Sequence, residues 1–151
     1  MTESEYQREL FERLKQRSNR EGILTRDVGM TVTEITPGKA VGEIEFSENS
    51  INPRYLVHGG ALFGVMDQLG GLAACTTGFG VVTVNGGIDF LRPTKPGEAL
   101  TCTATILKPG RRFTTCEAVI ISRQSGKLIA KGTFTYCMME ELKITVEKVC
   151  S

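Results

Sequence analysis

The chain has 151 residues, of which 40% are hydrophobic and 23% charged, values typical of one globular domain and not of a disordered or fibrous protein. Its 18 basic and 17 acidic residues give a formal net charge of +1, which excludes a broad positive surface for nucleic acid or an anionic membrane. We therefore expect a single domain over residues 1–151, with no nucleic-acid or membrane partner.

The first 22 residues predict a helix followed by a linker. Their N-terminal stretch lacks the apolar core of a secretory signal, which predicts a cytoplasmic protein whose cysteines are free thiols. Acidic residues begin the segment 3–18 and basic residues end it, the order that a helix dipole favours. The apolar residues that share one helical face are Tyr6, Leu10, Phe11 and Leu14. We expect this amphipathic helix to pack on the domain rather than on a membrane.

From residue 28 onward, segments rich in Thr, Val, Ile and Phe alternate with turns that contain Pro-Gly or Ser-Gly. Turns this short cannot connect parallel strands, so a mostly antiparallel sheet is predicted. Leu100, Cys102 and Ala104 alternate with threonines, which indicates that one face of the sheet is buried. The expected strands are residues 28–36, 39–47, 81–92, 98–108, 112–124 and 127–138. The tail 140–151 fits either a last strand or a loose end.

Residues 59–77 interrupt the strand pattern with an apolar segment that is too long for a strand, and they predict a buried central helix. A membrane span is the competing interpretation. Asp67 and Gln68 at the midpoint, together with five glycines, disfavour it. Those glycines would allow the helix to lie close to a sheet that curls around it.

Two features of this helix are candidates for chemistry. A carboxylate in an apolar helix is costly to bury unless it is partnered or used, so Asp67 is either a catalytic acid or a satisfied structural one. The helix start, His58-Gly59-Gly60, presents unpaired N–H groups and the positive end of the dipole. The Gly59 N–H could polarise a substrate carbonyl, although a tight helix entry with a capping histidine explains the same residues.

Asp67 lies eight residues after Gly59. On one helix this separation is about 12 Å of rise, which is too far for both residues to act on one carbonyl. If both act on one substrate, they come from different copies of the chain. A two-fold axis between antiparallel helices would create two such sites in each dimer.

The spacing of these residues is specific: Asn52 is followed six residues later by His58-Gly59-Gly60, and Asp67 lies nine residues after His58. This pattern resembles the signature of the PaaI-like acyl-CoA thioesterases, which have the hotdog fold. The resemblance covers nearly the whole chain and includes residues 89–94 and 95–98. It implies an α+β hotdog fold, in which an antiparallel sheet of five or six strands wraps around a long central helix, with an N-terminal amphipathic helix.

The resemblance also implies roles for the catalytic candidates. Asp67 would be the base or nucleophile that delivers water to the thioester carbonyl, opposite the Gly59 N–H and Asn52 of the partner subunit. His58 would orient the Asn52 loop and the helix start. Thr83 occupies the place where some relatives have a serine that positions the water.

For the substrate, the resemblance implies an acyl-CoA and a homo-oligomer, a dimer at least and a tetramer by analogy. No separate cofactor is expected, because coenzyme A is part of the substrate. No metal site is expected either, because the cysteines form no CxxC pair and His58 is the only histidine. The residues implied in substrate binding are Gly60, Val84, Asn85 and Gly86 beside the pantetheine and acyl group, and Arg92, Arg111 and Arg112 for the phosphates. The Arg111-Arg112 turn is more simply explained as a solvated hairpin.

Other functions remain open at this stage. A non-catalytic hotdog domain that binds acyl-CoA or acyl carrier protein is the main alternative, because a fold does not specify an activity. A hotdog dehydratase or hydratase is disfavoured, since His58 precedes the helix in the thioesterase arrangement. The acyl group is open between aromatic, short-chain and medium-chain thioesters.

Overall fold

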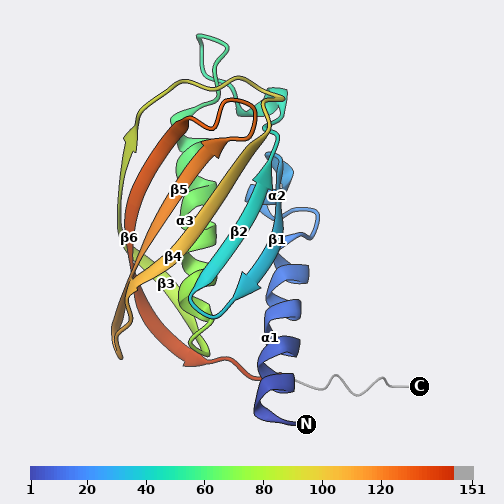
Figure 1. Cartoon of the computed structure of the whole chain (residues 1–151), viewed down its shortest axis with the longest axis vertical. Helices are drawn as coiled ribbons and strands as arrows, with labels where there is room; N and C mark the ends of the chain where they lie inside the picture. The colour runs from blue at the N-terminus through green and yellow to red at the C-terminus, as the bar shows by residue number, and fades with distance from the viewer. Residues whose placement is uncertain (145–151) are drawn as a thin grey trace, which may run out of the picture.

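One six-stranded sheet curls around a single long helix in the computed structural model, which describes residues 1–144 (Figure 1). Helices α1 (Glu3–Ser18) and α2 (Leu24–Asp27) precede strands β1 (Met30–Thr36) and β2 (Lys39–Ile44). A short 3-10 helix, η1 (Glu48–Ser50), leads into the long helix α3 (Gly59–Cys75). The remaining strands are β3 (Phe79–Phe90), β4 (Leu100–Lys108), β5 (Phe113–Ser122) and β6 (Leu128–Glu141).

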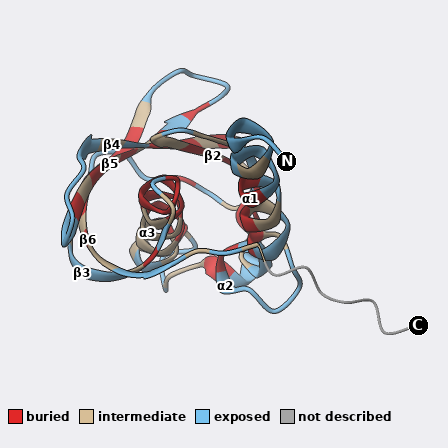
Figure 2. Cartoon of the chain, turned by 90° about the horizontal axis from the view of Figure 1, so that it is seen from below, coloured by how far each residue is buried: buried red, intermediate tan, exposed pale blue. Residues whose placement is uncertain are grey.

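All strand pairs are antiparallel, in the order β1-β2-β4-β5-β6-β3. The sheet wraps around α3, while α1 packs against β1, the edge strand at the opposite end of the strand order from β3 (Figure 2). The expected sheet, central helix and N-terminal helix are confirmed. Strand β3 pairs with β6 alone, so it forms one edge of the sheet.

The core lies between α3 and the concave face of the sheet. Alternate residues of β4, namely Leu100, Cys102 and Ala104, are fully buried there, as their alternation with threonine predicts. Val65 and Leu69 on the facing side of α3 are also fully buried. Alternate residues of the strands and residues three or four apart on α3 therefore point into the same apolar layer.

The expectation that α3 is buried on every side is wrong for the single chain. Gly60 is exposed, and Gly64, Asp67, Gln68 and Gly71 are only partly buried. The glycines also differ in use: a Cβ at Gly64 would meet open space, whereas a Cβ at Gly70 would meet the hydroxyl of Tyr136 on β6. Gly70 therefore allows α3 to approach the sheet closely, whereas Gly64 does not have this function. One face of α3 is left uncovered in the single chain.

The sequence did not predict α2 or η1, because helices of four and three residues are too short to show periodicity. Helix α3 ends at Cys75, two residues before the expected end, and β6 continues to Glu141, so the start of the tail is a strand. Residues 145–151 lie outside the described residues. No helix of residues 1–144 is long and apolar enough to cross a membrane.

The packing of α3 on β6 gives a stability prediction. Gly70→Ala places a methyl group against the Tyr136 hydroxyl, so it should lower the free energy of unfolding by about 1–3 kcal/mol, the usual cost of overpacking. Gly71→Ala is the matched control, because its Cβ would lie at an ordinary 3.5 Å from Tyr136 and alanine favours a helix by about 1 kcal/mol. Urea denaturation measures both. Equal stability of the two variants would contradict this account of Gly70.

Candidate active site

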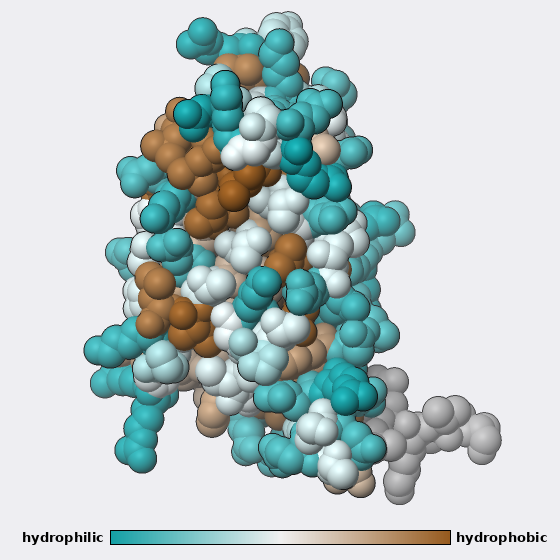
Figure 3. Space-filling model, in the orientation of Figure 1, coloured by the Kyte–Doolittle hydropathy of each residue, from teal (hydrophilic) through white to brown (hydrophobic). Residues whose placement is uncertain are grey.

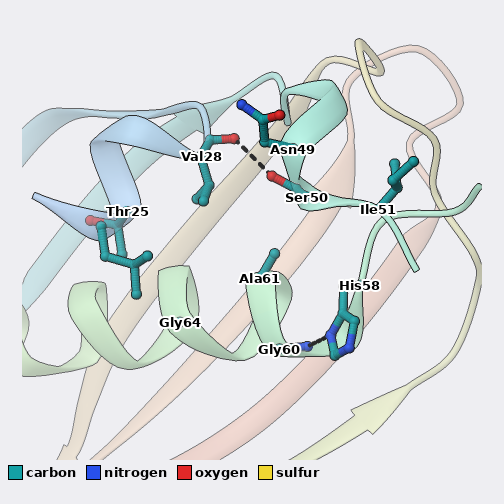
Figure 4. Close-up of a pocket in the computed structure, with 10 residues that line it drawn as sticks. Thr25, Val28, Asn49, Ser50, Ile51, His58, Gly60, Ala61 and Gly64 are labelled. Atoms are coloured by element: carbon teal, nitrogen blue, oxygen red, sulfur yellow. Dashed lines mark hydrogen bonds between the residues drawn. The ribbon is translucent and has the colours of Figure 1, made fainter. Parts of the chain in front are cut away.

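His58 organises the start of α3. Its backbone N–H donates to Ser50 O at 2.6 Å, and its Nδ1 accepts the Gly60 N–H at 2.8 Å (Figure 4). Since Nδ1 is the acceptor, it carries no proton in this arrangement. The Gly60 N–H is therefore engaged, whereas the Gly59 N–H has no acceptor among residues 1–144. Gly59 is the helix-start donor that is left for a ligand.

The loop before α3 is held by Asn52. Its Oδ1 accepts the N–H groups of Arg54 at 2.9 Å and Leu56 at 3.2 Å. Tyr55 between them has a φ of 61°, a left-handed conformation that needs such support. With Oδ1 committed to the loop, the Nδ2 amide is the part of Asn52 that can donate to a substrate.

Asn52 and Gly59 line one cavity of about 270 Å³, hereafter the Arg92 cavity. The Phe90 ring lies over Gly59, where a Cβ would come within 3.3 Å of the ring. Arg92 is fixed at the same cavity because its Nη1 donates to Leu128 O at 2.8 Å. The structure thus brings together two predicted carbonyl donors and one predicted phosphate ligand. We call Asn52 and Gly59 the donor half.

Asp67 is held from two sides. Thr83 on β3 donates from Oγ1 to Asp67 Oδ1 at 2.7 Å, and Tyr136 on β6 donates to the main-chain oxygen of Asp67, also at 2.7 Å. Burial and the nearby Asp67 carboxylate raise the pKa of Tyr136, so its hydroxyl stays protonated and remains a donor. The acid half, Asp67 and Thr83, therefore has a fixed backbone and a fixed side chain.

Tyr136 was missed from the sequence. It is 1% exposed and faces α3. A signal was present, because Phe134 and Tyr136 alternate on β6, and a tyrosine on the buried face of a strand needs a partner for its hydroxyl. That signal predicts a hydrogen bond but not which residue accepts it.

The donor half and the acid half are separate in one chain. Asn52 and Gly59 line the Arg92 cavity, and neither Asp67 nor Thr83 lies along its wall. The helical rise of about 12 Å between Gly59 and Asp67 is far more than the 3 to 3.5 Å at which a nucleophile attacks a carbonyl. The structure of one chain thus keeps the predicted carbonyl donors apart from the predicted acid.

Comparison with known proteins shows the family. The model of the thioesterase superfamily matches residues 56–129, which contain the start of α3, Asp67 and Thr83. Human acyl-coenzyme A thioesterase 13 is 30% identical over 130 residues, which cover 85% of this chain and 91% of that protein. The chain belongs to the thioesterase superfamily.

Two further relatives place this thioesterase among the PaaI-like hotdog proteins. The acyl-coenzyme A thioesterase PaaI of Escherichia coli is 29% identical over 97 residues, which cover 64% of this chain and 69% of PaaI. The E. coli PaaI structure has the same fold, with a TM-score of 0.80 at 22% identity over 88% of this chain and 96% of that chain. The smu.793 protein of Streptococcus mutans, solved bound to acetyl CoA, has a TM-score of 0.73 at 26% identity, covering 76% and 92%.

The expected substrate-binding residues of β3 differ in their surroundings. Val84 lies at a bulge between Thr83 and Asn85 and is 52% exposed. Asn85 pairs with Thr135 on the face of the sheet turned away from α3. A side chain at Gly86 would meet the rings of Phe134 and Phe63, whereas a Cβ at the neighbouring Gly87 would meet nothing within 4 Å.

The basic residues of the thioesterase lie at two ends of the sheet. Arg111 and Arg112 occupy the β4–β5 turn, at the end opposite the start of α3 (Figure 1). The guanidinium of Arg112 lies 5.4 Å from the ring centre of Phe113, which neighbours the β6 residue Cys137. Arg92 is therefore on the donor half, and the Arg111-Arg112 turn is nearer to the acid half.

Residues 1–144 hold no group of metal ligands, and three of their four cysteines are buried. Residues 1–144 contain no cluster of three His, Cys, Asp or Glu side chains that could hold a metal ion. Cys75, Cys102, Cys116 and Cys137 are free thiols, as expected, and Cys150 lies outside the described residues. Burial raises the pKa of Cys75 to about 11 and that of Cys116 to about 12, and it raises the pKa of Cys102 further. These three thiols are therefore not nucleophiles near neutral pH.

The raised thiol pKa values predict the labelling pattern. A thiol whose pKa is raised carries less thiolate at any pH below that value, so Cys75, Cys102 and Cys116 should resist iodoacetamide at pH 8 in the folded protein. In guanidinium chloride all three should react, because an unfolded cysteine has a pKa of about 8.5. Peptide mapping of the labelled protein gives the readout. Equal labelling of Cys102 in both conditions would contradict its burial.

Proposed function

We propose that this thioesterase hydrolyses acyl-CoA thioesters at sites that two copies of the chain share. The observation that carries the proposal is the division of the predicted site into a donor half and an acid half. Each half contains only part of what ester hydrolysis needs. The relatives named acyl-coenzyme A thioesterases and the similar protein solved with acetyl CoA support this substrate class.

The donor half suits a thioester carbonyl. The unpaired Gly59 N–H lies at the positive end of the α3 dipole, and the Asn52 amide can donate beside it. Donors that are already oriented stabilise the negative charge that develops on the carbonyl oxygen. His58 contributes indirectly, because its hydrogen bond to Gly60 fixes the turn from which Gly59 donates.

The acid half suits the activation of water. Thr83 occupies one lone pair of Asp67 Oδ1, which orients the carboxylate while its other lone pairs can accept from water. Acting as general base, Asp67 takes a proton from water as the water oxygen bonds to the carbonyl carbon. The tetrahedral intermediate then breaks its carbon–sulfur bond and expels the CoA thiolate, which takes up the proton that Asp67 received, and the carboxylic acid remains as the second product. As a nucleophile, Asp67 would instead form an anhydride that water opens.

The edge strand β3 supplies a surface for the second copy. Val82, Val84 and Phe90 on this strand are 50%, 52% and 54% exposed. Hydrophobic surface gathers along the side of the molecule where β3 and β6 lie (Figure 3). A long apolar edge strand exposed to water promotes association, and pairing with another copy would satisfy its free N–H and C=O groups. A dimer is the minimum that the divided site requires, and a tetramer stays a prediction.

The CoA phosphates would meet cations from both halves. Arg92 lies with Asn52 and Gly59 at the donor half, and the Arg111-Arg112 turn extends from the end of the sheet near Thr83. In a shared site these groups would come from two subunits. Guanidinium groups can bind phosphate through paired hydrogen bonds, so this arrangement fits a diphosphate better than a neutral leaving group.

The role of Asp67 is tested by Asp67→Asn, which keeps the shape of the side chain and its hydrogen bond with Thr83. The variant should hydrolyse decanoyl-CoA at least about 100-fold more slowly, the range for a lost general base, with little change in KM. Glu34→Gln on the opposite edge strand β1 is the control, because it removes an exposed carboxylate far from α3. A thiol-release assay measures both. A folded Asp67→Asn protein with wild-type turnover would exclude Asp67 as the base or nucleophile of the reaction.

Sharing of the site is tested by mixing two inactive variants. Asn52→Asp retains the acceptor for the Arg54 and Leu56 amides but loses the Nδ2 donor, so it should impair the donor half without opening the loop. Refolded with Asp67→Asn, it gives mixed dimers in which one site carries both lesions and the other carries neither. Since random mixing makes about half of the dimers mixed, roughly a quarter of wild-type activity should return. Mixed dimers, shown by mass to form and yet as inactive as both parents, would exclude a site between subunits.

A further inference from the structure

A second cavity lies on the other side of the α3 start. It has a volume of about 320 Å³ and is enclosed by α2, η1 and the first two turns of α3 (Figure 4). We call it the α2 cavity. Its lining residues are Leu24, Thr25, Val28, Asn49, Ser50, Ile51, His58, Gly60, Ala61 and Gly64. The volume is at the lower end of the range for small-molecule sites.

The apolar part of the wall is aliphatic. Leu24 of α2 and Val28, which directly follows α2, lie across from Ile51 and Ala61, and no Phe, Tyr or Trp side chain lines the cavity. The polar lining residues are Thr25, Asn49, Ser50 and His58. Gly64 forms part of the floor, and a Cβ there would meet nothing within 4 Å. Leu24 is 70% exposed although it is apolar, so the wall continues to the surface and the far end is not closed.

The position of the α2 cavity relates it to the carbonyl site. His58 and Gly60 line the α2 cavity, while Gly59 between them lines the Arg92 cavity. The N–H proposed to hold the thioester carbonyl thus lies between an aliphatic cavity on one side and a cavity with an arginine on the other. A thioester is arranged in the same order: an apolar acyl group lies on one side of its carbonyl, and the CoA arm with its phosphates lies on the other.

We infer that the α2 cavity receives the acyl group, and that its occupant is a flexible aliphatic chain of medium length. This inference rests on the proposed function and deepens it. A cavity with aliphatic walls and an open far end fits a chain of variable length better than a rigid aromatic ring. Each methylene buried in such a site strengthens binding by about fourfold.

Chain-length preference then depends on α2 and η1. These elements precede residue 56, where the match to the thioesterase superfamily model begins. Thr25 also lines the cavity; it is 4% exposed, and its Oγ1 is the one buried side-chain polar atom without a partner among the described residues. An aliphatic chain cannot pair with this hydroxyl, so the apolar residues of the wall are the ones that would contact the chain.

The test separates binding from hydrolysis by using CoA thioethers, which have no carbonyl and cannot be hydrolysed. Calorimetry compares S-ethyl-CoA, S-decyl-CoA and S-benzyl-CoA with the wild type and two variants. Val28→Trp fills the cavity, and Leu24→Glu places a charge at its exposed mouth, where the fold tolerates it. Ile121→Trp and Ile121→Glu are the matched controls, because Ile121 on β5 is 41% exposed and does not line either cavity.

The wild type should bind S-decyl-CoA more tightly than S-ethyl-CoA and S-benzyl-CoA. Each α2 variant should weaken S-decyl-CoA by about tenfold or more, which corresponds to two or more methylenes, and change S-ethyl-CoA by less than about twofold. The controls should leave the affinities unchanged. Equal effects on both alkyl ligands in folded Leu24→Glu, or tightest binding of S-benzyl-CoA, would overturn the inference. Wild-type protein that shows this binding pattern and yet hydrolyses neither acetyl-CoA nor decanoyl-CoA would overturn the proposed function alone.

Discussion

The contact between α3 and β6 is the constraint on which the rest of the structure depends. Gly70 has no side chain at the point where the Tyr136 ring meets the helix, and the Tyr136 hydroxyl donates to the main chain of Asp67. Close packing and a buried hydrogen bond therefore act on the same turn of the helix. A polar residue in an apolar helix is tolerated because its backbone and its side chain are both held, the side chain by Thr83.

Because α3 is held in this way, the positions of Gly59 at its start and Asp67 in its middle are also fixed. The start of the helix projects its free Gly59 N–H toward the Arg92 cavity, while Asp67 faces β3 two turns later. The single chain keeps these groups apart, since the helix that carries both is rigid. A divided site of this kind makes activity depend on association, so catalysis and assembly are linked in the proposed enzyme.

The start of α3 lies between a mostly apolar cavity and a cavity that contains an arginine, which its own sequence does not predict. His58 and Gly60 belong to an aliphatic cavity, and Gly59 with Asn52 belongs to one that contains Arg92. Both cavities depend on segments that lie outside α3, the loop 52–58 and the short helix α2. The family-like core supplies the catalytic groups, and these more local segments shape the space around them.

The sequence by itself determined the periodic elements. Alternation in β4 and the helical repeat of residues 3–18 correctly predicted a sheet with one buried face and α1, because both periods depend only on burial of one face. The short turns predicted antiparallel pairing, and the length and apolarity of residues 59–77 predicted α3. The sequence also identified Asp67 and Gly59 as candidates and predicted that, if both act on one substrate, they come from different copies, since helical rise follows from residue number alone. Only the tertiary structure decided which groups contact Asp67, because Thr83 and Tyr136 come from strands at a distance of 16 and 69 residues in sequence. It also decided that Gly86 packs on two phenylalanine rings and that one face of α3 stays uncovered, because these facts depend on how separate elements meet in space.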